Sequence, residues 1–173
     1  MKNGLPVRKN IRLRHYDYSS AGYYDVTICI EGKRKLFGKA SDGKIHLTEY
    51  GEIAERELLK IPQHYKNVKI DKHVIMPNHV HVIIVLVGDA LARPALSSGA
   101  ASGAPTFGKD ISNAPTIGNI VRGYKAGVSR KFGFSCWQRG YYEHVIRDET
   151  DYLKRWQFAI PLSTRLHCSQ ITH

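Results

Sequence analysis

The chain has few cysteines, and their positions argue against two kinds of structure. They are Cys29, Cys136 and Cys168, an odd number without a CxxC pair. That spacing indicates neither a disulfide framework nor a zinc ribbon. We therefore expect the protein to work in a reducing compartment.

Long apolar runs are also missing from the sequence. No run approaches the roughly 20 residues that span a bilayer, and the first six residues lack the apolar core of a signal peptide. We therefore expect a cytoplasmic protein without a membrane partner.

Acidic residues are few compared with basic ones. The 15 Asp and Glu stand against 26 Lys and Arg, which leaves a net charge of +11 at pH 7. Such an excess is typical of proteins that bind nucleic-acid phosphates, although membrane-surface binding and simple solubility are competing explanations. At 173 residues the whole chain, 1–173, suits one domain with a single sizeable core.

Residue patterns predict strands and helices in a definite order. Residues 23–30 are β-branched and aromatic and predict a strand, and Asp42-Gly43 predicts a tight turn before a short strand at 44–47. Thr48 can cap a helix that runs to about residue 60 and is ended by Pro62. The other predicted elements are strands at 68–75 and 79–87, a helix at 116–131, and a last helix at 149–158 that Asp148 caps and Pro161 ends.

Two histidines, His79 and His81, open the apolar strand predicted at 79–87. Alternate side chains of a strand share a face, so the two imidazoles project from the same face. Neutral imidazole is a common ligand, and the pair therefore suggests a divalent metal site. The pattern alone is weak, because 9 histidines in 173 residues give about 0.5 His-x-His pairs by chance.

Two segments lack any periodicity. Residues 88–115 are rich in Ala, Ser, Gly and Pro, which predicts a flexible linker or flap. Residues 162–173 form the second segment, which we expect to be a frayed tail.

Basic residues with aromatic or apolar neighbours occur at three places and are predicted nucleic-acid contacts. Lys and Arg can bind phosphates, and an aromatic ring can stack on an exposed base. A solvated charged face is the alternative for the basic residues, and core packing is the alternative for the aromatic ones. The predicted contacts are Arg12 and Arg14 near the start, Arg122, Lys125, Arg130 and Lys131 on the helix at 116–131, and Arg139 and Tyr141 within 137–147.

With residues 137–147 taken as a strand and the short strand at 44–47 left aside, the predicted order is strand, helix, two strands, helix, strand, helix. It is compatible with an α+β ferredoxin-like sandwich, with an antiparallel sheet and helices on one face.

Several blocks of the sequence carry a resemblance to a known family. The most specific are Met76-Pro77-Asn78-His79-Val80-His81 and Trp137-Gln138-Arg139-Gly140-Tyr141-Tyr142-Glu143-His144, with further blocks at 12–19, 24–29 and 48–53. Over roughly residues 8–158 the chain resembles the REP-associated tyrosine transposases, which belong to the HUH single-tyrosine nucleases.

The resemblance implies a metal-dependent DNA transposase or endonuclease. Its partner would be single-stranded or hairpin DNA, and His79 and His81 would hold a divalent metal, Mg or Mn. A side-chain amide of the last helix would complete the ligands, and a tyrosine of that helix would attack the scissile phosphate to give a covalent phosphotyrosine. The resemblance leaves open whether the protein is a monomer or a homodimer.

The chain departs from the family at the expected nucleophile. Phe158 occupies the tyrosine position, and Leu162 offers no ligand where the amide would fall. Tyr152 lies about two helical turns earlier and is a weak substitute. We therefore expect a copy that binds DNA but cleaves it poorly, with a catalytically inactive protein that recognises repeated hairpins as the alternative.

Overall fold

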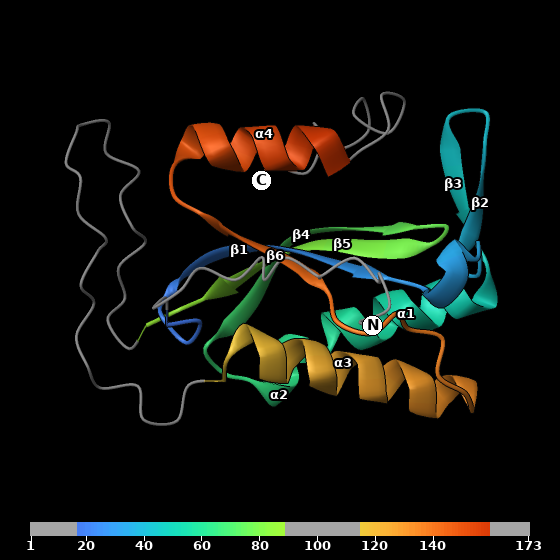
Figure 1. The fold of residues 1–173 in the computed structure, drawn as a ribbon, viewed down its shortest axis with the longest axis horizontal. Coiled ribbons are helices and arrows are strands. Elements are labelled where there is room, and N and C mark those ends of the chain that lie inside the picture. Colours follow the sequence, from blue (N-terminus) through green and yellow to red (C-terminus); the bar gives the residue numbers. More distant parts are fainter. Residues whose placement is uncertain (1–16, 89–114, 160–173) are drawn as a thin grey trace, which may run out of the picture.

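A computed structural model describes residues 17–88 and 115–159. Its main sheet has the strand order β4-β5-β1-β6, and all neighbouring strands are antiparallel (Figure 1). Helix α1 lies between β1 and β4 in the sequence, and α3 lies between β5 and β6, which is the ferredoxin-like connectivity. The sheet strands are β1 (Gly22–Cys29), β4 (Val68–Met76), β5 (His79–Leu86) and β6 (Tyr142–Ile146), and the helices are α1 (Glu49–Leu59), α2 (Ile61–His64), α3 (Ile117–Phe132) and α4 (Glu149–Ala159).

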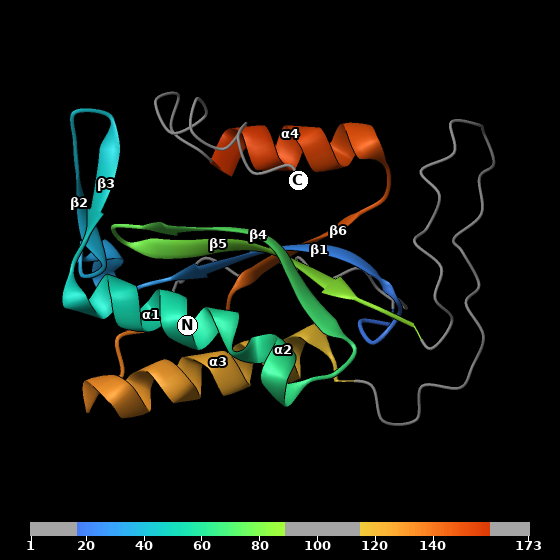
Figure 2. The ribbon, with the colours of Figure 1, turned by 180° about the vertical axis from the view of Figure 1, so that it is seen from behind.

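The helices cover both faces of the sheet. Helices α1, α2 and α3 lie on one face, as expected, whereas α4 lies across the opposite face (Figures 1 and 2). The sequence order alone did not place α4, because a last helix can fold back over either face of the sheet. Its later turns point toward the end of the sheet that holds the β4–β5 turn.

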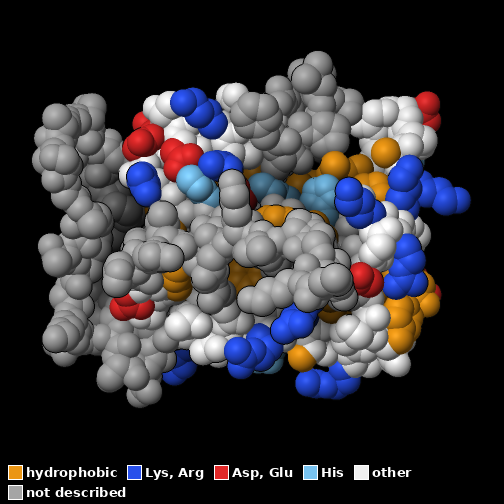
Figure 3. All heavy atoms as spheres, in the orientation of Figure 1, with side chains coloured by type: hydrophobic (Ala, Val, Ile, Leu, Met, Phe, Trp, Pro, Cys, Tyr) orange, Lys and Arg blue, Asp and Glu red, His pale blue; other side chains and the backbone are white. Residues whose placement is uncertain are grey.

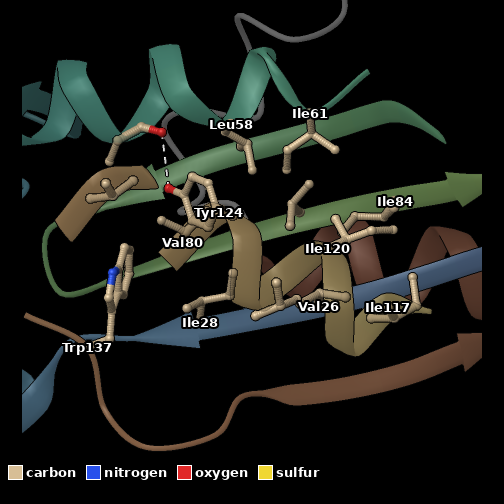
Figure 4. Close-up of a cluster of buried hydrophobic side chains, with 14 of the residues drawn as sticks. Val26, Ile28, Leu58, Ile61, Val80, Ile84, Ile117, Ile120, Tyr124 and Trp137 are labelled. Atoms are coloured by element: carbon tan, nitrogen blue, oxygen red, sulfur yellow. Dashed lines mark hydrogen bonds between the residues drawn. The ribbon is translucent and has the colours of Figure 1, made fainter. Parts of the chain in front are cut away.

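The main core lies between the sheet and helices α1 to α3 (Figure 4). Val26 of β1 and Val80 of β5 are fully buried there, against Ile120 of α3. The hydroxyl of Tyr124 donates a 3.0 Å hydrogen bond to the carbonyl of Ala54 and so joins α3 to α1. The apolar side chains at helical spacing in α3 therefore pack against the alternate side chains of the strands that point to the same face.

The connection from β1 to α1 contains a short 3-10 helix, η1 (Glu31–Lys33), and a separate hairpin of β2 (Gly38–Ser41) and β3 (Lys44–Leu47). The turn predicted at Asp42-Gly43 is confirmed, since both residues have positive φ, 50° and 70°. The cap predicted at Thr48 is also confirmed, because its hydroxyl accepts a hydrogen bond from the amide of Gly51.

The predicted end of the helix near residue 60 is confirmed, whereas the role predicted for Pro62 was wrong. Pro62 does not end α1, which stops at Leu59, but lies in the first turn of α2. Proline is compatible with that position because the first-turn amides need no partner within the helix.

Several sequence expectations lie outside the described residues. These are Arg12 and Arg14, most of the predicted linker at 88–115, and the predicted tail at 162–173. Within residues 17–88 and 115–159, no helix is long and apolar enough to cross a membrane.

Candidate metal and DNA site

The predicted strand with the two histidines forms β5, and both imidazoles lie on the sheet face that α4 covers. Val80 and Val82 point into the main core, and Ile83 packs against Trp156 of α4. His79 pairs with Cys29 of β1, and His81 pairs with Thr27. Histidine side chains are visible along this face beside Lys and Arg side chains (Figure 3).

His79 has one ring nitrogen held by its neighbour. Its Nδ1 lies 2.8 Å from the amide oxygen of Asn78, so Nδ1 carries the proton and donates to that oxygen. Burial, and then the nearby His81, lower the pKa of His79. The ring is therefore neutral at pH 7, and Nε2 keeps its lone pair.

His81 touches β1 through both ring nitrogens. Its Nδ1 lies 3.2 Å from the hydroxyl of Thr27, and its Nε2 lies 3.1 Å from Oδ1 of Asp25. The contact between Nε2 of His81 and Oδ1 of Asp25 lacks hydrogen-bond geometry. Both atoms are buried, and neither has a hydrogen-bond partner among the described residues. Burial lowers the pKa of His81 and raises that of Asp25, while each side chain shifts the pKa of the other in the opposite direction.

A polar cluster fixes α4 over this face. His144 of β6 donates from Nε2 to Asp151, at 2.7 Å, and accepts at Nδ1 from the guanidinium of Arg155, at 3.2 Å. His144 is the cross-strand neighbour of Asp25, so the cluster adjoins the histidine pair. We call His144, Asp151 and Arg155 the α4 clamp.

Apolar contacts hold the same helix beside the clamp. Trp156 and Ile83 are buried together, and Tyr23, Ile146 and Tyr152 pack against them. The hydroxyl of Tyr152 donates to Asp71 of β4, and Tyr23 lies four residues before Thr27, or about 13 Å along the strand. Tyr152 thus lies near the end of β1 opposite to the one that pairs with His79.

The predicted nucleophile position lies in the last turn of α4. Phe158 belongs to that helix, whose later turns point toward the sheet end that carries His79.

The predicted DNA contacts do not gather at the histidine pair. Arg122, Arg130 and Lys131 are exposed on α3, which covers the opposite face of the sheet. Arg139 is exposed as well, whereas Tyr141 is half-buried and packs against the main core.

Lys125 has a structural role in this arrangement. Its ammonium group donates to the carbonyls of Gln138 and Gly140, at 2.9 Å for the first, and lies over the ring of Trp137. Trp137 returns a hydrogen bond from its indole nitrogen to the carbonyl of Lys125 and is largely buried. The core-packing alternative therefore describes Trp137 correctly.

Sequence reasoning missed the residues around the histidine pair. Asp25 and Thr27 lie in the strand predicted at 23–30, and its two-residue alternation puts them on one face, away from the buried Val26. That signal was available, whereas the pairing of Asp25 with His144 and with His81 depends on strand register. His144 belongs to a block that carried the family resemblance, although no role followed from it.

Comparison with known proteins gives a family and a fold. No protein-family model matches this chain. The chain is 40% identical over 161 residues to an uncharacterized protein of Haemophilus influenzae, covering 90% of this chain and 87% of that protein. The chain belongs to the same family as that protein.

A solved structure extends the comparison beyond this Haemophilus family. The REP-associated tyrosine transposase bound to a REP hairpin superposes with a TM-score of 0.58 at 17% identity, over 86% of this chain and 68% of that one. The family therefore has the fold of this transposase. The fold agrees with the resemblance that the sequence blocks carry.

Proposed function

We propose that the protein binds hairpin or single-stranded DNA through the sheet face that carries His79 and His81. The observation that supports this most strongly is the placement of both imidazoles under α4, within a fold shared with a transposase that was solved bound to a REP hairpin. The net charge of +11 would add a salt-dependent attraction to phosphates. The exposed cations Arg122, Arg130 and Lys131 lie on α3, over the opposite face, so we propose them, with the exposed Arg139, as a separate set of phosphate contacts outside the histidine face.

The histidine pair suits a divalent cation such as Mg²⁺ or Mn²⁺. His79 keeps Nε2 available while Asn78 orients its ring, and His81 has a buried Nε2 without a hydrogen-bond partner among the described residues. Depressed pKa values keep both rings neutral, as ligands must be. When bound, such a cation polarises a phosphate and stabilises the charge that develops on it.

We further propose that this chain cleaves DNA poorly. Phe158 has no hydroxyl to attack phosphorus, and the hydroxyl of Tyr152 is already bonded to Asp71. The protein would then hold a hairpin without forming a covalent link to it.

Two readouts on the same samples test this proposal. Fluorescence anisotropy with a labelled DNA hairpin should show binding that weakens as salt is raised. A denaturing gel of the same mixtures with Mn²⁺ should show little covalent adduct. A strong adduct that maps to any tyrosine would refute the cleavage defect, and the absence of hairpin binding would refute the function.

The second candidate is a DNA-binding protein whose role no longer includes cleavage. The bonded hydroxyl of Tyr152 favours it, because no tyrosine of α4 is then free to react. A Phe158→Tyr variant with a transposase-like turn after it discriminates the two. Recovered adduct would indicate recent loss of an enzyme, whereas unchanged binding without adduct would indicate a binding protein.

A further inference from the structure

Asp25 and His81 form a buried pair next to the proposed metal site. The inference below rests on that proposed site. We propose that Asp25 is itself a ligand of the cation, joining Nε2 of His81 through its own Oδ1. The metal site would then consist of one carboxylate from β1 and two imidazoles from β5.

The spacing of the two atoms supports a shared cation. Oδ1 of Asp25 and Nε2 of His81 lie 3.1 Å apart. Two ligands at about 2.1 Å from an octahedral ion, at right angles to each other, lie about 3.0 Å apart. The observed distance therefore suits adjacent positions around one ion.

The lack of a hydrogen bond supports the same conclusion. Each side chain is only 10% exposed, and the contact between the two atoms is not aligned for hydrogen bonding. A buried polar atom without a partner costs about 1–3 kcal/mol, so a native site normally satisfies it. A cation between the two atoms would satisfy both at once.

The opposite side of the His81 ring fits this role. The hydroxyl of Thr27 lies 3.2 Å from Nδ1 and can accept a hydrogen bond from its N–H. With the proton on Nδ1, Nε2 has the lone pair that a metal requires. Asp25 thus lies beside Nε2, the nitrogen that would bind the metal. A carboxylate that only oriented the ring would lie beside Nδ1 instead.

His79 would complete the set after a side-chain adjustment. Among the described residues, no three His, Cys, Asp or Glu side chains already converge as a metal-binding group. His79 lies on the same face two residues from His81, and its Nε2 is available. Arg155 reaches the same region, but Asp151 and His144 hold its guanidinium. Asp25 and His81 are therefore the two proposed ligands, out of three, that already lie close together.

Manganese affinity tests the role of Asp25 without DNA or catalysis. Free Mn²⁺ is followed by electron paramagnetic resonance while the full chain is titrated. Asp25→Asn keeps the side-chain shape but removes the charged ligand, and we expect it to weaken Mn²⁺ binding by more than the about 10- to 100-fold that loss of an orienting partner costs. Asp71→Asn is the matched control, because it removes the same charge from the same sheet face, and at most about a fivefold change is expected.

A ligand exchange gives a direct spectroscopic readout. In Asp25→Cys loaded with Co²⁺, a thiolate at position 25 that binds the ion produces a sulfur-to-cobalt charge-transfer band. The unmodified chain, which contains Cys29, Cys136 and Cys168, gives the baseline spectrum, and Asp71→Cys should not add a band to it. Circular dichroism melts confirm that the variants fold.

The outcomes separate this inference from the proposed function. If His79→Ala loses Mn²⁺ while Asp25→Asn binds as well as Asp71→Asn, the role of Asp25 is overturned and the histidine site stands. A variant Asp25→Cys that binds Co²⁺ without the band also overturns it. If the unmodified chain binds no Mn²⁺, the proposed metal site and the role of Asp25 fail together, and hairpin affinity then decides the DNA-binding function alone.

Discussion

The hydroxyl of Tyr152 in α4 donates a 2.6 Å hydrogen bond to the carboxylate of Asp71 in β4. Burial, and then this carboxylate, raise the pKa of Tyr152 above its ordinary value, so the hydroxyl stays protonated at neutral pH. The ring also packs edge-on against Tyr23, with centroids 6.0 Å apart. These contacts suit an anchor for α4 better than a nucleophile, which needs an activated oxygen.

Removing this hydroxyl should therefore affect stability and not DNA binding. We expect Tyr152→Phe to lower the free energy of unfolding by about 0.5–1.5 kcal/mol, because one hydrogen bond is lost. Urea denaturation measures the change, and Tyr142→Phe is the control, since Tyr142 is 48% exposed. A Tyr152→Phe variant that keeps its stability but loses hairpin affinity would contradict the anchoring role.

The α4 clamp predicts a dependence of stability on pH. Burial alone would raise the pKa of Asp151, but its hydrogen bond and charge interaction with His144, followed by contacts from Arg147 and Arg155, lower it below 3.8. A carboxylate with a lowered pKa contributes stability that is present above the unfolded-state pKa and is lost as the pH falls through the folded-state value. The contribution of Asp151 should therefore disappear below about pH 4.

Denaturation at pH 6 and pH 3 checks this dependence. Asp151→Asn should be less stable than the unmodified chain at pH 6, and the difference should shrink at pH 3. Asp42→Asn, in the exposed β2–β3 turn, is the control and should show no such convergence. If Asp151→Asn lowered stability equally at both pH values, the negative charge of Asp151 would not be the source of its stabilising effect.

The exposed cations of α3 predict a change in salt dependence. If Arg130 contacts a phosphate, Arg130→Ala should weaken binding to any hairpin sequence and reduce the salt slope by about 1. Arg56→Ala is the control, because Arg56 is also exposed on a helix but lies 3.9 Å from Glu52. Equal slopes for both variants would place the DNA away from α3.

A close backbone contact at Gly51 predicts a stability effect. A Cβ at this position would lie 2.1 Å from the carbonyl oxygen of Phe37, so the start of α1 would have to move. We expect Gly51→Ala to destabilise the fold by about 1–3 kcal/mol, as overpacking does. Gly123→Ala is the control, since its nearest neighbour is the hydroxyl of Tyr65 at 3.1 Å, which can shift slightly. Similar thermal melting of both variants would contradict the contact.

Local patterns predicted the elements of this fold, but not the contacts between them. Alternation placed His79 and His81 on one face, and the turn residues at Asp42-Gly43 fixed a hairpin, because both signals are carried by neighbouring residues. The contact between Asp25 and His81 joins two strands about 55 residues apart, and only the register of β1 against β5 creates it.

Side chains that cross between elements were the hardest to predict. The helical pattern places Lys125 outside the apolar face of α3, where a lysine is normally solvated. Its ammonium group nevertheless donates to the carbonyls of Gln138 and Gly140. Long lysine stems can reach partners that helical periodicity does not reveal. The position of α4 is a similar case, because its covered face depends on Trp156 meeting Ile83.

The most direct test of the proposed function compares three DNA ligands under one buffer condition. Anisotropy is measured for a labelled hairpin, for an unstructured single strand and for a blunt duplex of the same length and composition. The hairpin or the single strand should bind more tightly than the duplex, and His79→Ala with Mn²⁺ present should weaken this preference. Equal affinity for all three ligands would indicate only nonspecific attraction to a +11 protein and would contradict the proposed function.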